Sequence, residues 1–210
     1  MTIDAHDVRL RLCVITDDLR DGREGLVART LAAERGGATM VVLRLKHADA
    51  ATAVEVGRAL VRALRIPLLV HERLDVALAC GAAGVHVSAA SMPAVALRQH
   101  APAEFLIGVA IGDDADVPCA RGADFVTVGP VFGAGTESVI GLEGLARLQK
   151  ACGVPAIAVG GIDVARAALL RAHGASGVAV IRAVLGSDDP EAEALALVTA
   201  FGDAAPARVP

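Results

Sequence analysis

Short, nearly continuous apolar runs recur along the chain, and Ala- and Leu-rich stretches of helical character separate them. Four of the runs follow a Gly-Ala-x-x-Val pattern, which occurs at Gly37, Gly81, Gly122 and Gly174. A glycine directly after a helix suits the left-handed conformation of that position, where a Cβ would be penalised. The repeat therefore predicts a helix, a glycine that ends it, and a strand.

Four further apolar runs lie between these repeats, at residues 10–16, 66–71, 104–110 and 154–160. Runs without polar alternation are typical of strands buried on both faces, as in parallel sheets. Helices are predicted between the strands, at residues 24–35, 50–64, 74–80, 93–100, 114–121, 143–151, 163–172 and 190–201.

Repeated strand–helix units of this kind predict an α/β fold, a single-domain (β/α)8 TIM barrel over residues 9–202. The remaining residues, 1–8 and 203–210, are predicted to be an N-terminal and a C-terminal tail. A doubly wound open sheet is the alternative architecture.

Composition and charge exclude several classes of partner. A net charge of −4 and the absence of Trp and Tyr argue against a nucleic-acid-binding surface. The N-terminus lacks the basic and apolar regions of a signal peptide, and no apolar run reaches the roughly 18–20 residues of a membrane span. We therefore expect a cytoplasmic protein with a small-molecule partner, no nucleic acid and no membrane; the sequence leaves a homodimer open.

The cysteines are widely spaced and show no C-x-x-C pairing. Metal sites and disulfide frameworks need closer or patterned spacing. Small buried apolar side chains are therefore the expected role of Cys13, Cys80, Cys119 and Cys152.

In a barrel, the active site lies at the C-terminal ends of the strands. The predicted first strand ends in Thr16, Asp17 and Asp18, and the second in Arg44 and Lys46. Both cations share strand parity with Val42, so both are predicted to point into the barrel. Burying them unpaired would be costly, so we expect either an anionic ligand or a carboxylate such as Glu72 as their partner.

The predicted third strand ends in "LVHERLD", residues 69–75. The pKa of an ordinary imidazole, about 6.5, suits proton transfer at neutral pH. His71 and Glu72 are therefore the candidate catalytic pair, with His71 as acid or base and Glu72 orienting it or a cation. Arg73, which shares parity with His71, is the candidate contact to a substrate anion. The alternative is that these residues pair with neighbouring cations and hold the loop.

Glycines and a cation follow the predicted seventh and eighth strands, in "AVGGID" and "GVAVIRAV". Backbone amides beside a helix N-terminus bind phosphate well, and barrels often do so after these two strands. A phosphate site is therefore predicted at Gly160, Gly161, Ile181 and Arg182, with the Arg182 side chain as an added cation. Tight packing of strand against helix is the alternative.

In this order, the stretches "VVLRLK", "VHERLDVALACGAAGVHVSAASMP", "GADFVTVGPVF", "GLEGL" and "AVGGI" resemble the thiamine phosphate synthase and TenI superfamily. The resemblance covers most of the chain. It implies a (β/α)8 barrel that binds a phosphorylated ligand of the thiamine pathway.

Several positions depart from the synthase pattern that the resemblance implies. The Gln of the second strand is Val42, and the two Asp residues that hold Mg²⁺ correspond to Glu72 and Ser91. The phosphate-handling loop T-x-T-K reads A-G-T-E at residues 134–137, which leaves Thr136 as a candidate substrate-binding residue. Glu137 then stands where the pattern has a cation, and an anion there would repel a diphosphate.

These departures favour the TenI-like branch, a metal-free thiazole phosphate isomerase (tautomerase) without a cofactor. One feature speaks against that branch, because the His that tautomerases carry after the sixth strand is Pro130 here. A divergent thiamine phosphate synthase, which joins hydroxymethylpyrimidine diphosphate to thiazole phosphate, is the first alternative and would require Mg²⁺. A non-catalytic barrel that binds a phosphorylated ligand is the second.

Overall fold

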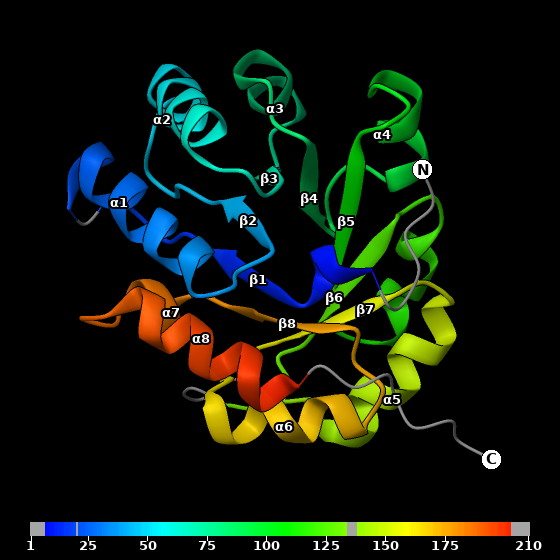
Figure 1. Cartoon of the computed structure of the whole chain (residues 1–210). Coiled ribbons are helices and arrows are strands. Elements are labelled where there is room, and N and C mark those ends of the chain that lie inside the picture. The colour runs from blue at the N-terminus through cyan, green and yellow to red at the C-terminus, as the bar shows by residue number, and fades with distance from the viewer. Residues whose placement is uncertain (1–6, 20, 134–137, 203–210) are drawn as a thin grey trace.

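Across residues 7–19, 21–133 and 138–202, which the computed structural model describes, eight parallel strands close into a barrel in sequence order (Figure 1). β1 pairs with β8 and so closes the ring. The strands are β1 (Leu12–Ile15), β2 (Met40–Leu43), β3 (Leu68–His71), β4 (Gly84–Ser88), β5 (Leu106–Ile111), β6 (Phe125–Val128), β7 (Ala156–Val159) and β8 (Gly177–Val180). The predicted (β/α)8 barrel is confirmed, and the doubly wound alternative is wrong.

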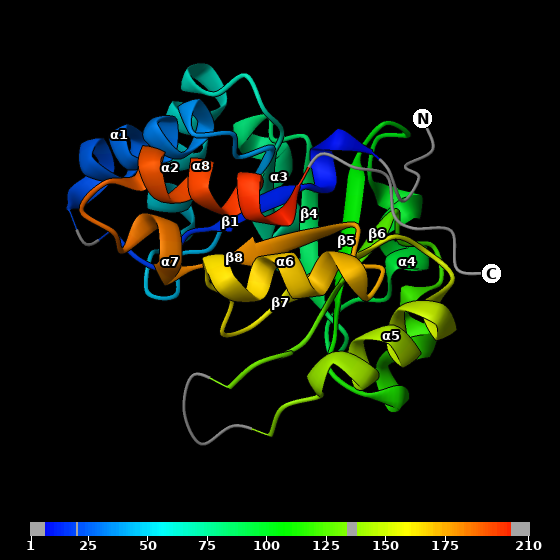
Figure 2. The same cartoon turned by 60° about the horizontal axis from the view of Figure 1, so that its bottom comes forward.

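Helices surround the barrel, and α1, α7 and α8 lie side by side along one flank in both views (Figures 1 and 2). The α-helices are α1 (Gly22–Arg35), α2 (Ala50–Ala63), α3 (Leu74–Cys80), α4 (Ala94–His100), α5 (Gly141–Cys152), α6 (Val164–Ala172), α7 (Arg182–Leu185) and α8 (Pro190–Phe201). Two 3₁₀ segments are η1 (Val8–Leu10) and η2 (Asp114–Ala120). The α-helix predicted at 114–121 is thus a 3₁₀ helix, since Pro118 lies inside it and supplies no backbone N–H.

The glycines of the repeat have the predicted conformation. Gly37, Gly81, Gly122 and Gly174 have φ values of 104°, 76°, 86° and 86°. Each of them follows a helical segment and comes before a strand. The repeat therefore reflects the need to end each helix before the next strand, and a glycine with positive φ does this.

The barrel interior is filled by inward side chains from alternate strand positions, among them Cys13, Ile15, Met40, Val42, Leu69, Phe125, Ile157 and Ala179. Phe125 is fully buried, and a Cβ at Gly108 on β5 would lie only 2.4 Å from its ring. A second, larger core lies between the strands and the helices. Val42 belongs to the interior set, which confirms the parity that directs Arg44 inward.

All four cysteines are free thiols; Cys13 and Cys80 are buried, as predicted, whereas Cys119 and Cys152 are partly exposed. Among the described residues, no helix combines the length and the apolar character needed to cross a bilayer. The predicted C-terminal tail, and all of the N-terminal one except Asp7 and Val8, lie outside the described residues.

Candidate active site

A cavity of about 660 Å³ opens at the C-terminal ends of β1, β2, β7 and β8. Two of the three predicted groups of site residues line it, namely the cations after β2 and the glycines after β7 with the start of α7. The predicted catalytic pair after β3, His71 and Glu72, does not line it. The lining residues are Asp17, Arg44, Lys46, Pro130, Phe132, Val159, Gly160, Gly161, Ile162, Ala179, Val180, Ile181, Arg182 and Ala183. The structure therefore places the predicted phosphate site and the predicted cation pair in one cavity.

The wall after β7 depends on Gly161. Its φ of 61° lies in the left-handed region, and a Cβ there would come within 2.4 Å of the backbone oxygen of Phe132. The loop after β6 approaches closely because the Phe132 amide donates to the Gly160 carbonyl oxygen at 3.1 Å. Only glycine combines this conformation with this close contact.

Gly161→Ala is expected to weaken binding of inorganic phosphate by roughly tenfold, because the added Cβ must push Phe132 and the cavity wall apart. Isothermal titration calorimetry would measure this. Gly153→Ala is the matched control, since Gly153 has a similar φ of 67° but nothing within 4 Å of an added Cβ. Equal phosphate affinity in the two variants would contradict a phosphate site at this wall.

The cation pair after β2 has a carboxylate partner that the sequence did not assign. Lys46 Nζ lies 3.3 Å and Arg44 Nη1 lies 3.5 Å from Oδ1 of Asp17. The predicted alternative partner, Glu72, instead makes its contacts with His71, Ser88 and Ser91. The predicted kind of partner, a carboxylate, is therefore confirmed, but it is Asp17 and not Glu72.

Glu72 ties the ends of β3 and β4 together. Its Oε1 accepts a hydrogen bond from the Ser88 amide at 2.7 Å, and its Oε2 accepts one from the Ser91 hydroxyl. Burial raises the pKa of the carboxyl, but the hydrogen bonds from Ser91 and Ser88 and the nearby His71 outweigh burial and leave the pKa below its usual value. Glu72 is thus an ionised carboxylate that organises the rim.

A second histidine, His86 on β4, lies beside His71. The ring of His86 stacks on that of His71 with centroids 5.8 Å apart, and its Nε2 lies 3.0 Å from Thr127 Oγ1. Burial, with Arg44 as a further cause, lowers the pKa of His71, although Glu72 opposes the shift. Burial and the neighbouring His71 lower the pKa of His86 to about 3. Both imidazoles are therefore neutral at neutral pH.

The structure does not bring Arg73 to the cavity. Strand parity ends at Glu72, whose φ of 64° turns the chain, and Arg73 then precedes α3. The Arg73 guanidinium pairs with Asp75 at 2.6 Å, and half of its side chain is exposed. Thr136, with the rest of loop 134–137, lies outside the described residues.

His86, which stacks on the candidate catalytic residue His71, was not singled out from the sequence. The only signal was a histidine inside the apolar strand "GVHVS", at a position of inward parity. Asp17 was noted at the end of the first strand, but its pairing with the cations depends on side-chain positions.

The described residues do not fit a resident Mg²⁺ site. Where the resemblance implies two carboxylates, Glu72 already accepts hydrogen bonds with both oxygens, and Ser91 supplies a hydroxyl. Within the described parts of the chain, no cluster of three or more His, Cys, Asp or Glu side chains could hold a metal ion. Mg²⁺ prefers sites built from carboxylates and substrate phosphates.

Ser91→Asp is therefore expected to raise the affinity for a divalent metal ion. A second carboxylate beside Glu72 should tighten binding of Mn²⁺, a spectroscopic substitute for Mg²⁺, by roughly tenfold or more. Electron paramagnetic resonance of free Mn²⁺ would measure it, and the double variant Ser91→Asp, Glu72→Gln, which again has only one carboxylate there, is the control. Equally tight Mn²⁺ binding by the wild type and by Ser91→Asp would show that the native residues already form the site.

A parallel eight-stranded barrel with a cavity at the C-terminal strand ends defines the class of (β/α)8-barrel enzymes. The family model described as thiamine monophosphate synthase matches residues 12–184, and the chain belongs to this family.

Relatives that match most of the chain are named thiamine-phosphate synthase. A thiamine-phosphate synthase from Roseiflexus sp. is 40% identical over 193 residues, which cover 88% of this chain and 82% of the relative. One from Albidiferax ferrireducens is 39% identical over 207 residues, covering 92% and 94%. The solved structure of a thiamine phosphate pyrophosphorylase from Pyrococcus furiosus superposes with a TM-score of 0.83 at 33% identity, covering 92% of this chain and 96% of that one.

These findings correct the branch expected from the sequence. The superfamily is right, but the relatives support the synthase alternative and not the TenI-like tautomerase. The sequence reasoning gave most weight to a few site positions such as Ser91 and loop 134–137, whereas the similarity extends over nearly the whole barrel.

Proposed function

We propose that the protein is a thiamine-phosphate synthase that joins hydroxymethylpyrimidine diphosphate to thiazole phosphate and releases pyrophosphate. One observation carries the proposal: a single cavity contains a glycine wall at Gly160 and Gly161 and, separately, the cation pair Arg44 and Lys46. Two phosphorylated substrates need two such places. The names of the relatives and of the similar solved structure support the same reaction.

In this proposal, the thiazole phosphate lies against Gly160, Gly161, Ile181 and Arg182, which line the cavity, and it accepts hydrogen bonds from backbone amides and the Arg182 guanidinium. Fixing the phosphate there orients the thiazole ring towards the barrel axis. The ring nitrogen is then held near the second substrate, which lowers the entropic cost of their meeting.

The diphosphate of the second substrate lies against Arg44 and Lys46. The bond between its pyrimidine methylene carbon and the diphosphate oxygen breaks, and the oxygen keeps the electron pair. The thiazole nitrogen supplies the pair for the new C–N bond. Negative charge therefore grows on the leaving pyrophosphate, and fixed cations stabilise it most when they are already in place. The proton-transfer role of His71 stays a prediction.

Incubating the protein with both substrates and Mg²⁺ tests the proposal. Chromatography with fluorescent detection should show thiamine phosphate, and its amount should equal the pyrophosphate released. Adding Mg²⁺ ensures that a negative result does not reflect a missing ion. Rearrangement of a thiazole carboxylate phosphate without any thiamine phosphate would support the tautomerase and contradict the synthase.

A further inference from the structure

Asp17 forms ion pairs with Arg44 and Lys46, the same two cations that bind the diphosphate in the proposed reaction. Ile15 on β1 lies opposite Val42 on β2. Continuing this register by two residues on each strand places Asp17 opposite Arg44. A single oxygen of Asp17 then lies within 3.5 Å of nitrogens from both Arg44 and Lys46. An anion that binds this pair must therefore compete with Asp17.

The backbone beneath this contact is fixed. Thr16 is fully buried, and its hydroxyl accepts a hydrogen bond from the Arg44 amide at 2.8 Å and donates one to the Arg44 carbonyl oxygen at 3.0 Å. These bonds lock the ends of β1 and β2 together directly beside Asp17. The carboxylate and the cations thus start from set positions, although all three side chains reach solvent.

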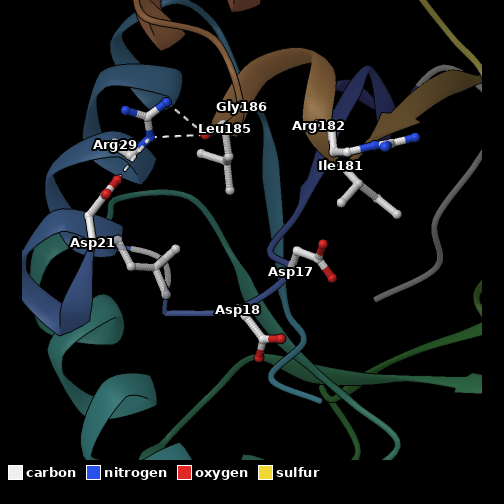
Figure 3. A pocket seen from close by; sticks show the side chains of 9 residues that line it. Asp17, Asp18, Asp21, Arg29, Ile181, Arg182, Leu185 and Gly186 are labelled. Atoms are coloured by element: carbon white, nitrogen blue, oxygen red, sulfur yellow. Dashed lines mark hydrogen bonds and ion pairs between the residues drawn. The ribbon is translucent and has the colours of Figure 1, made fainter. Parts of the chain in front are cut away.

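Space is available for the carboxylate to leave. A second cavity, of about 270 Å³, lies between α1, the segment after β1 and α7, and Asp17 lines both cavities. Figure 3 shows Asp17 and Asp18 on one side of this space, with Ile181 and Arg182 across from them. Arg29, also in this space, is held by the Leu185 carbonyl oxygen at 2.9 Å, so it keeps its own partner.

We propose that Asp17 is a displaceable counter-ion, which holds Arg44 and Lys46 while the diphosphate subsite is empty and returns to them as pyrophosphate leaves. The inference rests on the proposed function, which makes pyrophosphate the product. Competition from Asp17 weakens the hold of the cations on pyrophosphate and so promotes its release. Asp17 is thereby a positioning residue that acts through the two cations.

Calorimetric titration of inorganic pyrophosphate into the metal-free protein tests this directly. Asp17→Asn should bind pyrophosphate about tenfold more tightly than the wild type, because two exposed ion pairs no longer compete and a like charge is gone. Asp17→Glu should stay close to the wild type. A damaged fold would weaken binding, so tighter binding cannot arise from misfolding.

Asp18→Asn is the matched control. It removes the same charge one residue further on, but Asp18 faces His47 at 3.8 Å and does not line the cavity that contains Arg44 and Lys46. Its effect on pyrophosphate affinity should stay within about twofold, and the difference between the two variants should shrink at high salt.

Weaker or unchanged binding by Asp17→Asn relative to Asp18→Asn would overturn the inference, and so would a wild type that binds no pyrophosphate. Asp17→Ser, with thermal unfolding of each variant as a check, guards against a fold defect in one substitution. Pyrophosphate binding requires no turnover. If no thiamine phosphate forms but Asp17→Asn still binds pyrophosphate more tightly, the proposed function fails and the counter-ion role stands.

Discussion

Arg44→Met is expected to lower kcat for thiamine phosphate formation by about 10²–10³-fold, the usual effect of removing one group that stabilises transition-state charge. Methionine keeps most of the length of the side chain but removes the guanidinium that faces the cavity. Lys46 alone would then meet the charge of the departing pyrophosphate. Because this charge grows only as the bond breaks, kcat should fall more than the substrate KM rises.

Steady-state kinetics with both substrates would measure the effect. Arg73→Met is the control, since the Arg73 side chain pairs with Asp75 outside the cavity, and its kcat should stay within about twofold of the wild type. Equal losses in the two variants would mean that the decrease reflects general charge or stability and not the cavity. A loss confined to Arg73→Met would restore its predicted contact to the substrate anion.

Acid is expected to destabilise the fold through His86. Above about pH 6.5 this histidine is neutral in both the folded and the unfolded chain, so it contributes no pH dependence. Below that pH His86 binds a proton in the unfolded chain but not in the folded chain, because burial lowers the pKa of His86 in the folded chain to about 3. Stability should therefore fall by about 1.4 kcal/mol per pH unit, or about 2 kcal/mol between pH 7 and pH 5, and the fall should continue to about pH 3.

Urea unfolding of the wild type and of His86→Gln across pH 7.5 to 5 would measure the slope. The variant lacks the titrating ring, so its free energy of unfolding should depend on pH less steeply by about one proton. The remaining slope should keep the same sign, because the folded pKa of His71 is also lowered. Parallel pH profiles for the two proteins would contradict a neutral, buried His86.

The sequence predicted the barrel well for a physical reason. Parallel strands covered on both faces must be apolar throughout, and each helix must stop before the next strand, so the apolar runs and the glycines at Gly37, Gly81, Gly122 and Gly174 carry the architecture. Strand parity also placed Arg44 correctly, since Val42 on the same strand is buried in the barrel interior.

Strand parity predicted the wrong position for Arg73, because the strand ends before this residue. Glu72 adopts a φ of 64°, which no apolar pattern reveals, and this turn sends Arg73 to the surface. His86 was missed because a histidine within an apolar strand resembles any other core position. The Asp17 partnership depends on where three partly exposed side chains meet, which spacing alone does not determine.

In the proposed function, one cavity holds two phosphorylated groups at separate places. A crystal structure of the protein with thiazole phosphate and inorganic pyrophosphate tests it most directly. We expect the phosphate against Gly160, Gly161, Ile181 and Arg182, and the pyrophosphate against Arg44 and Lys46 with Asp17 turned away. Both anions at one place, or either bound outside this cavity, would contradict it.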